Sequence, residues 1–82
     1  MKIIWDETKR IVNLEKHGLD FADLYFEFFA TAVTTPAKKA RSKAVGRLKD
    51  GTIVVIFLVL GSEAISVISM RPARKDERSM IE

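Results

Sequence analysis

One apolar run, residues 53–60, constrains the fold of this chain more than any other feature. It is made of β-branched, aromatic and aliphatic residues, with no charged group and no break. Such a run predicts a strand (52–60) that is buried on both faces and therefore central in a sheet. It is too short for a membrane-spanning helix, which needs about twenty residues. Asp50-Gly51, directly before it, predicts a tight hairpin with a strand over residues 44–49.

The segments around this hairpin predict the rest of the topology. They are a short strand over 2–5, an edge strand over 31–35 ending at Pro36, a basic loop over 36–43, a strand over 64–70 stopped by Pro72, and a charged helix over 74–78. With two further helices near the N-terminus, the pattern is that of an α+β fold. We expect the two N-terminal helices and the C-terminal helix to pack on one face of a mostly antiparallel sheet. At 82 residues, 1–82 is expected to form a single domain.

Local signals delimit the two N-terminal helices. Asp6 is a typical N-cap and Gly18 a typical C′ residue, which predicts a helix over 6–17 with Lys16 and His17 in its last turn. Asp20 is expected to cap a second helix over 20–30. That helix would present an apolar face at helical spacing, made of Phe21, Leu24, Tyr25, Phe28 and Phe29. This aromatic stripe favours a role in the core over base stacking.

Composition and charge exclude several kinds of site. The chain has no cysteine and one histidine, which excludes disulfides and thiolate metal sites and argues against a zinc site in one chain, so no metal or cofactor is expected. Acidic residues at positions 6 and 7 interrupt the first apolar residues, so no signal peptide is expected and a cytoplasmic location is favoured. Of the net charge of +3, residues 31–60 carry six basic and one acidic group. This basic block suits a polyanion, either nucleic acid or an acidic protein, although a solvated surface explains it equally well.

The remaining candidates suit RNA cleavage by the 2′-hydroxyl, which needs a base, an acid and cations but no metal. Arg71, Arg74 and Arg78 fall at the end of a strand and on one face of the following helix, where they could clamp phosphate. Spacing alone favours the alternative, a charged surface helix in which Glu77 and Asp76 form salt bridges. Lys16 and His17 fall at the end of the first helix, and Trp5 is expected to anchor the start of that helix in the core. These positions favour structural over catalytic roles for all three residues.

Three blocks of the sequence resemble the BrnT family of bacterial toxins. They are Trp5-Asp6-Glu7-Thr8-Lys9 with Asn13 and Lys16-His17-Gly18-Leu19-Asp20-Phe21, then Arg41 and Gly46, then Ile68-Ser69-Met70-Arg71-Pro72-Ala73 leading to Glu77-Arg78. The resemblance implies that the protein is the toxin of a type II toxin–antitoxin system and has a RelE-like ribonuclease fold. Such a toxin cleaves RNA without a metal ion and halts translation. The resemblance also implies a cognate antitoxin, BrnA-like and of the ribbon–helix–helix type, in a hetero-oligomer. By resemblance, Arg71 and the segment 74–78 would contribute to the RNA-cleaving surface.

The leading hypothesis is therefore an endoribonuclease toxin. Arg71 and Arg74 would be catalytic, and RNA would be bound by Arg47, Arg78, Lys38, Lys39, Arg41 and Lys43. The competing hypothesis is a catalytically degenerate toxin that acts as an antitoxin-binding or nucleic-acid-binding module. Residues 58–61, Leu-Val-Leu-Gly, motivate it, because many family members carry polar groups there. A third hypothesis is a structural subunit of a larger assembly.

Overall fold

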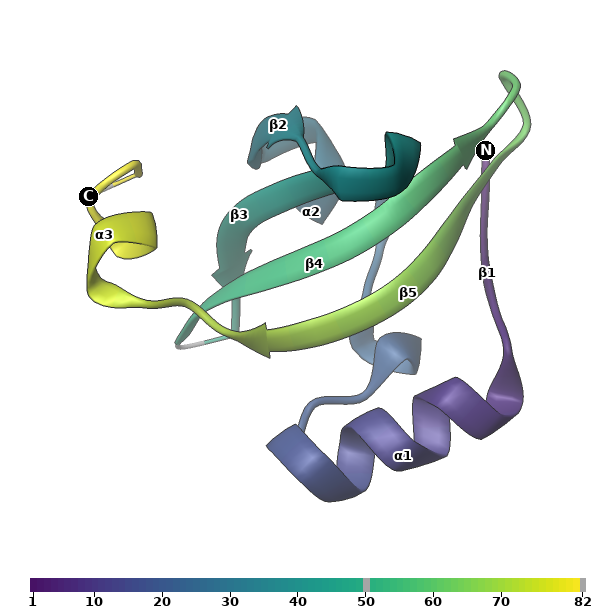
Figure 1. Ribbon diagram of the computed structural model, residues 1–82, viewed down its shortest axis with the longest axis horizontal. Helices are drawn as coiled ribbons and strands as arrows, with labels where there is room; N and C mark the ends of the chain where they lie inside the picture. Colours follow the sequence, from purple (N-terminus) through teal and green to yellow (C-terminus); the bar gives the residue numbers. More distant parts are fainter. Residues whose placement is uncertain (50, 82) are drawn as a thin grey trace.

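A five-stranded mixed sheet forms the centre of the computed structural model, which describes residues 1–49 and 51–81 (Figure 1). Its strands lie in the order β1-β5-β4-β3-β2. They are β1 (Lys2–Trp5), β2 (Val33–Pro36), β3 (Ser42–Leu48), β4 (Gly51–Leu60) and β5 (Ala64–Pro72). Neighbouring strands are antiparallel except β1 and β5, which are parallel. The α+β class, the mostly antiparallel sheet and the edge position of β2 are confirmed; Asp50 of the expected turn lies outside the described residues.

The apolar run forms β4, which lies between β3 and β5 as expected. Val54 and Val55 point to opposite faces and are both fully buried. The expected burial on both faces does not extend to the end of the run, where Val59 and Leu60 are 56% and 45% exposed. The cause is the register: β3 begins at Ser42 opposite Phe57, so the last three residues of β4 have a neighbour only in β5.

The first helix, α1 (Glu7–His17), forms where the capping residues predict it. The Asp6 carboxylate accepts a hydrogen bond of 2.9 Å from the backbone N–H of Thr8. Gly18 ends the helix in the left-handed region with φ 70°, and its N–H donates to the carbonyl of Leu14. Both ends are therefore fixed by bonds between near neighbours in sequence, which explains why the sequence predicts them well.

The expected second helix over 20–30 is wrong. The chain forms a 3₁₀ turn, η1 (Phe21–Asp23), and a short helix, α2 (Phe26–Thr31), separated by extended backbone at Leu24 and Tyr25. Asp20 does act as a cap, but its carboxylate accepts from the N–H of Ala22 at the start of η1. Tyr25 is 49% exposed and so does not belong to the apolar face.

Aromatic packing explains this break. Aromatic side chains lose rotamer freedom in helices, so the segment has little intrinsic preference and tertiary contacts decide its backbone. Phe21 meets Trp5 edge to face at 6.4 Å between ring centroids, while Phe29 meets Phe57 at 5.1 Å. The two ends of the segment are thus anchored at different places in the core.

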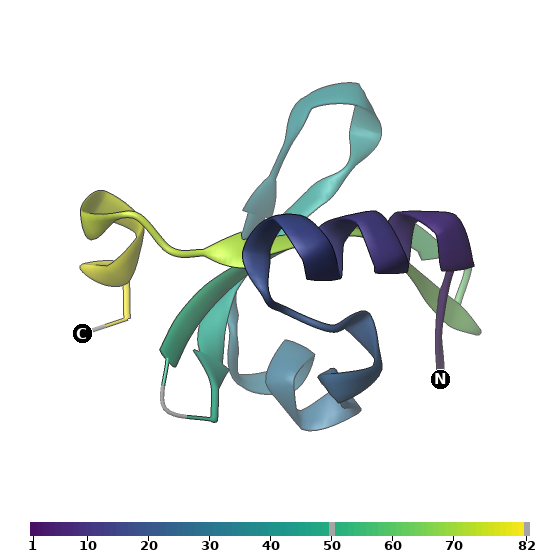
Figure 2. The ribbon, with the colours of Figure 1, turned by 90° about the horizontal axis from the view of Figure 1, so that it is seen from below.

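The helices do not all lie on one face of the sheet, contrary to the expectation. The main core lies between the sheet and η1 and α2, and its buried residues are Phe21, Leu24, Phe28, Ala44, Leu48, Ile53, Val55, Phe57, Ile65, Val67 and Met70. On the opposite face, Ala73 and Ile81 pack with Val45 and Val54 around the short helix α3 (Lys75–Arg78). Because β5 continues through Pro72 instead of ending before it, the chain reaches the far end of the sheet before α3 begins (Figure 2).

α1 covers the edge of β5 that β1 leaves open. β1 pairs with β5 only from Ala64 to Val67. Beyond that point, buried Asn13 accepts a hydrogen bond of 3.1 Å from the N–H of Met70 and donates one of 3.2 Å to the carbonyl of Leu19. The Asn13 side chain therefore provides a hydrogen-bond partner for an edge N–H of β5 and also connects the turn after α1 to that strand.

Replacement of Gly46 by alanine is expected to destabilise the protein by about 1–3 kcal/mol through overpacking. A Cβ at this buried position of β3 would lie 2.8 Å from Cε1 of Phe28 and 3.1 Å from Cβ of Ala32. Urea unfolding measures the loss. Gly51→Ala is the matched control, because a Cβ there meets no atom within 4 Å; equal losses in the two variants would contradict the packing argument.

Asn13→Ala should lower the free energy of unfolding by about 1–3 kcal/mol, because it leaves the Met70 N–H without its partner in a buried setting. Asn13→Asp retains an acceptor for Met70 but loses the donor to Leu19. Hydrogen exchange at the Met70 amide separates the two effects: it should accelerate more in Asn13→Ala than in Asn13→Asp. Similar acceleration in both would show that the amide is protected by something other than Asn13.

Candidate functional site

The sheet face opposite α2 carries three of the basic residues singled out in the sequence. Lys43 and Arg47 alternate with Val45 on β3, and Arg71 on β5 lies opposite Val54 of β4. Because Val45 and Val54 belong to the cluster on this face, the three cations point to the same side. Strand register thus brings together residues that are up to 28 positions apart in sequence.

The carboxylate of Glu77 joins two of these cations. Oε1 accepts from Nη1 of Arg71 at 2.7 Å and from the backbone N–H of Arg74 at 2.8 Å. Oε2 accepts from Nη2 of Arg71 at 2.8 Å and pairs with Nζ of Lys43 at 2.6 Å. The Glu77 side chain is 3% exposed, whereas those of Arg71 and Lys43 are about a quarter exposed. A buried carboxylate therefore holds two cations that reach the surface.

These contacts stabilise the charged forms of the groups. The hydrogen bonds from Arg71 hold the pKa of Glu77 well below its usual range despite burial, and the Arg74 amide and Lys43 act in the same direction. The same pairing raises the pKa of Arg71, against the opposing effect of burial. Glu77 and Arg71 are therefore held in their charged forms.

Arg71 keeps part of its guanidinium available. Glu77 occupies the end of the fork formed by Nη1 and Nη2, and a third N–H of Arg71 points to the carbonyl of Pro72 at 3.4 Å. A guanidinium has five N–H donors, so within residues 1–49 and 51–81 the edge made by Nε and Nη2 retains two without a partner. That edge matches two oxygens of a phosphate, and its direction is fixed by the bidentate pair on the other side.

The other candidates near α3 are placed differently. Arg74 donates its backbone N–H to Glu77, and its side chain lies at the surface. Arg78 donates from Nη1 to the carbonyl of Ala73 at 3.0 Å, which closes the turn before α3. Arg47 is exposed on the same sheet face as Arg71. Arg71 and Lys43 are thus brought into direct contact with one carboxylate, whereas the side chains of Arg47, Arg74 and Arg78 form no bond to it.

The basic loop between β2 and β3 lies on the same side of the sheet. It contains η2 (Lys38–Ala40), where Lys39 and Ala40 both adopt the left-handed region with φ 59° and 60°. Figure 2 shows this hairpin projecting from the sheet on the side away from η1 and α2. Lys38 and Lys39 are exposed and Arg41 is half-buried. The loop therefore extends the positive face beyond the sheet.

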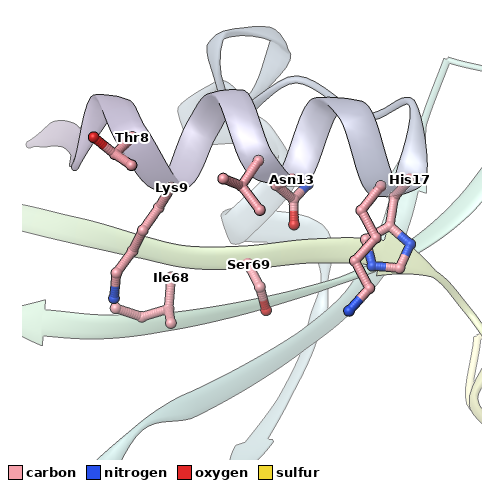
Figure 3. Close-up of a pocket in the computed structure, with 8 residues that line it drawn as sticks. Thr8, Lys9, Asn13, His17, Ile68 and Ser69 are labelled. Atoms are coloured by element: carbon pink, nitrogen blue, oxygen red, sulfur yellow. The ribbon is translucent and has the colours of Figure 1, made fainter.

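Several residues of the first block that resembles the BrnT family line a groove of about 450 Å³ between α1 and β5 (Figure 3). Its lining residues are Thr8, Lys9, Val12, Asn13, Lys16, His17, Ile68 and Ser69. Trp5 lies elsewhere: its ring packs on Phe21, and its Nε1 donates to Glu7 at 3.1 Å. The structure thus separates Trp5, in the core, from Lys16 and His17, which reach an open groove.

Two features of these sites escape sequence analysis. The spacing predicts Glu77 as a salt-bridge partner on an exposed helix, whereas its burial depends on contacts with β3 and β5 that no local pattern encodes. Lys9 and Ser69 belong to the resembling blocks, but their meeting across the groove depends on the packing of α1 on β5. A carboxylate three residues after the N-cap Arg74 was the available signal for Glu77.

Within residues 1–49 and 51–81, no group of three or more His, Cys, Asp or Glu side chains could hold a metal ion. No helix in this part of the chain is long and apolar enough to cross a membrane.

Comparison with known proteins gives the class of this molecule. A family described as "Ribonuclease toxin, BrnT, of type II toxin-antitoxin system" matches residues 5–77. The chain is therefore a ribonuclease toxin of a type II toxin–antitoxin system. The crystal structure of the Brucella abortus ribonuclease toxin BrnT is similar to it, with 58% sequence identity and a TM-score of 0.86 over 92% of this chain and 99% of that one. The chain belongs to the BrnT family. No curated protein matched the sequence.

Replacement of Glu77 by glutamine is expected to lower stability at neutral pH by about 3 kcal/mol, since a buried ion pair loses one partner. The folded-state pKa of Glu77 lies below the unfolded value of about 4.3, so its contribution is present above about pH 5 and is lost as the pH falls. The difference between wild type and variant should therefore shrink between about pH 5 and pH 3.

Chemical denaturation across this pH range measures the effect, and Glu15→Gln on the exposed face of α1 is the matched control. A difference between wild type and Glu77→Gln that stays constant with pH would show that lost packing, and not lost charge, causes the destabilisation.

Proposed function

We propose that the sheet face bearing Arg71, Lys43 and Arg47 is the RNA-cleaving surface of this toxin. The observation that carries the proposal is the bidentate pair of Arg71 with buried Glu77, which leaves one edge of the guanidinium free and aimed in a fixed direction. Preorganised cations of this kind stabilise charge that develops in a transition state. Arg74 supplies a second exposed cation beside the pair, and the basic loop with Lys38, Lys39 and Arg41 contacts the RNA backbone.

The reaction supported by this geometry is attack of a ribose 2′-hydroxyl on the adjacent phosphorus. The bond from phosphorus to the 5′ oxygen of the next nucleotide breaks, which leaves a 2′,3′-cyclic phosphate and a 5′-hydroxyl. One proton leaves the attacking hydroxyl and one is taken up by the departing oxygen. The free edge of Arg71 binds the non-bridging oxygens, where negative charge increases. This route operates without a metal ion, and cleavage of RNA inhibits translation.

Family membership and the basic surface support a proposal for the antitoxin partner, the fold type and the location of this toxin. The antitoxin is BrnA-like, of the ribbon–helix–helix type, and forms a hetero-oligomer with the toxin. An acidic stretch of it covers the positive face around Arg71 and the basic loop. The fold is of the RelE-like ribonuclease type, and the toxin acts in the cytoplasm.

The apolar residues at the end of β4 do not argue for a degenerate enzyme. Leu58 lies four residues along β4 from Val54, the residue opposite Arg71. At about 3.3 Å per residue this is roughly 13 Å along the strand, and Leu58 is roughly 7 Å from Ile56, the residue opposite Lys43. Glu77 contacts Arg71, the Arg74 amide and Lys43, and none of these lies in residues 58–61. The departure from the family pattern there therefore leaves the cluster intact, which favours an active ribonuclease over a binding module.

Replacement of Arg71 by lysine should lower the rate of RNA cleavage by roughly 10²–10³ and abolish growth arrest on induction. Lysine retains a charge for Glu77 but lacks the planar fork that binds two phosphate oxygens. Cleavage of a labelled RNA in vitro measures the effect. Lys2→Ala, at the start of β1, is the control and should cleave normally. Full activity of a folded Arg71→Lys variant would contradict the role given to Arg71.

A further inference from the structure

The groove between α1 and β5 is a second positively charged surface. Lys9 and Lys16 contribute positive charge to its lining, and none of the described residues that line it carries a carboxylate. Figure 3 shows Lys9 and His17 extending from α1 towards β5, with Ser69 between them. No salt bridge involves Lys9 or Lys16 in the part of the chain that the structure describes. Cations gathered without a counter-charge favour an anionic ligand.

The floor and walls of this groove are not uniformly charged. Val12, which is 56% exposed, and Ile68 give it apolar surface, while Thr8 and Ser69 provide hydroxyl groups. Its volume of about 450 Å³ falls in the range of pockets that hold small organic ligands. A ligand with an anionic group, a flat apolar group and hydrogen-bonding edges matches this lining, and a nucleotide has all three.

The groove is continuous with the face that carries Arg71. Ser69 lies opposite Ile56 and Arg71 opposite Val54, so both point to the same face of the sheet. Two residues of a strand span roughly 6.6 Å. A nucleic-acid strand whose cleaved phosphate contacts Arg71 can therefore place its next phosphate near Ser69, and the nucleotide beyond the cut dinucleotide in the mouth of the groove. The pairing of β4 with β5 shifts register between Ile56 and Phe57, so Ile68 lies at an irregular position of β5 next to Ser69.

We propose that the α1–β5 groove binds the RNA nucleotide next to the dinucleotide that is cleaved. Lys9 and Lys16 contact the backbone phosphate, and the base lies against Val12 and Ile68. This rests on the proposed cleavage at Arg71 and adds to it a subsite on a separate element. The groove then contributes affinity for RNA beyond the dinucleotide that is cut, and α1 acts as a substrate-binding helix as well as a cover for β5.

The test measures binding of RNA made uncleavable by 2′-O-methylation, as a dinucleotide and as a hexanucleotide. Lys9→Ala/Lys16→Ala should bind the hexanucleotide about 10-fold more weakly than wild type, with a salt slope reduced by about 1.4, since two phosphate contacts are lost. Dinucleotide binding should not change. The control Lys2→Ala/Lys49→Ala removes the same charge from other sites and should bind both RNAs as wild type does. Arg71→Lys should weaken both.

The outcomes separate the subsite from the proposed function. If the groove variant binds the hexanucleotide as wild type does, while Arg71→Lys binds weakly, the subsite is wrong and cleavage at Arg71 stands. If wild type neither binds nor cleaves RNA, the proposed function fails. Equal losses with dinucleotide and hexanucleotide would also overturn the subsite. Tighter groove-dependent binding of hexaglutamate than of RNA would assign the groove to an acidic protein instead.

Discussion

The buried carboxylate of Glu77 connects three separate parts of the chain. It bonds to β3 through Lys43, to β5 through Arg71 and to the start of α3 through the Arg74 amide. α3 has four residues, too few to be stable through its own backbone hydrogen bonds. Its position is fixed by this carboxylate and by the contacts of Ala73 and Ile81 with the sheet. One group therefore helps to attach α3 to the sheet and also fixes the direction of Arg71.

A buried charge of this kind costs free energy unless every lone pair is used. Both oxygens of Glu77 accept two bonds each, and none of the buried side-chain polar atoms among the described residues lacks a partner. In a transition state that transfers charge to phosphate oxygens, a cation that is already oriented needs no rearrangement. The polar cluster on this face thus combines the attachment of a helix with the preorganisation of a guanidinium.

Sequence reasoning succeeded where the determining interactions are local. The ends of α1 depend on Asp6 and Gly18, and the central place of β4 follows from its own apolar residues. It failed where distant contacts decide, as in the break at Leu24 and Tyr25. The site shows the same division: Arg71 and Lys43 were singled out as cations, but their meeting at Glu77 depends on the register of three strands. No pattern along the chain specifies that register before the sheet is assembled.

The parallel pairing of β1 with β5 has a consequence for folding during synthesis. The first strand finds its only neighbour some sixty residues later, at Ala64 to Val67. Closure of such a long loop is slow compared with formation of the β3–β4 hairpin. During synthesis the N-terminal segment must wait, unpaired, until most of the chain has been made. Arg71 and Glu77 lie later still in the sequence, so a chain synthesised only as far as β4 has neither a paired β1 nor an assembled cluster around Glu77.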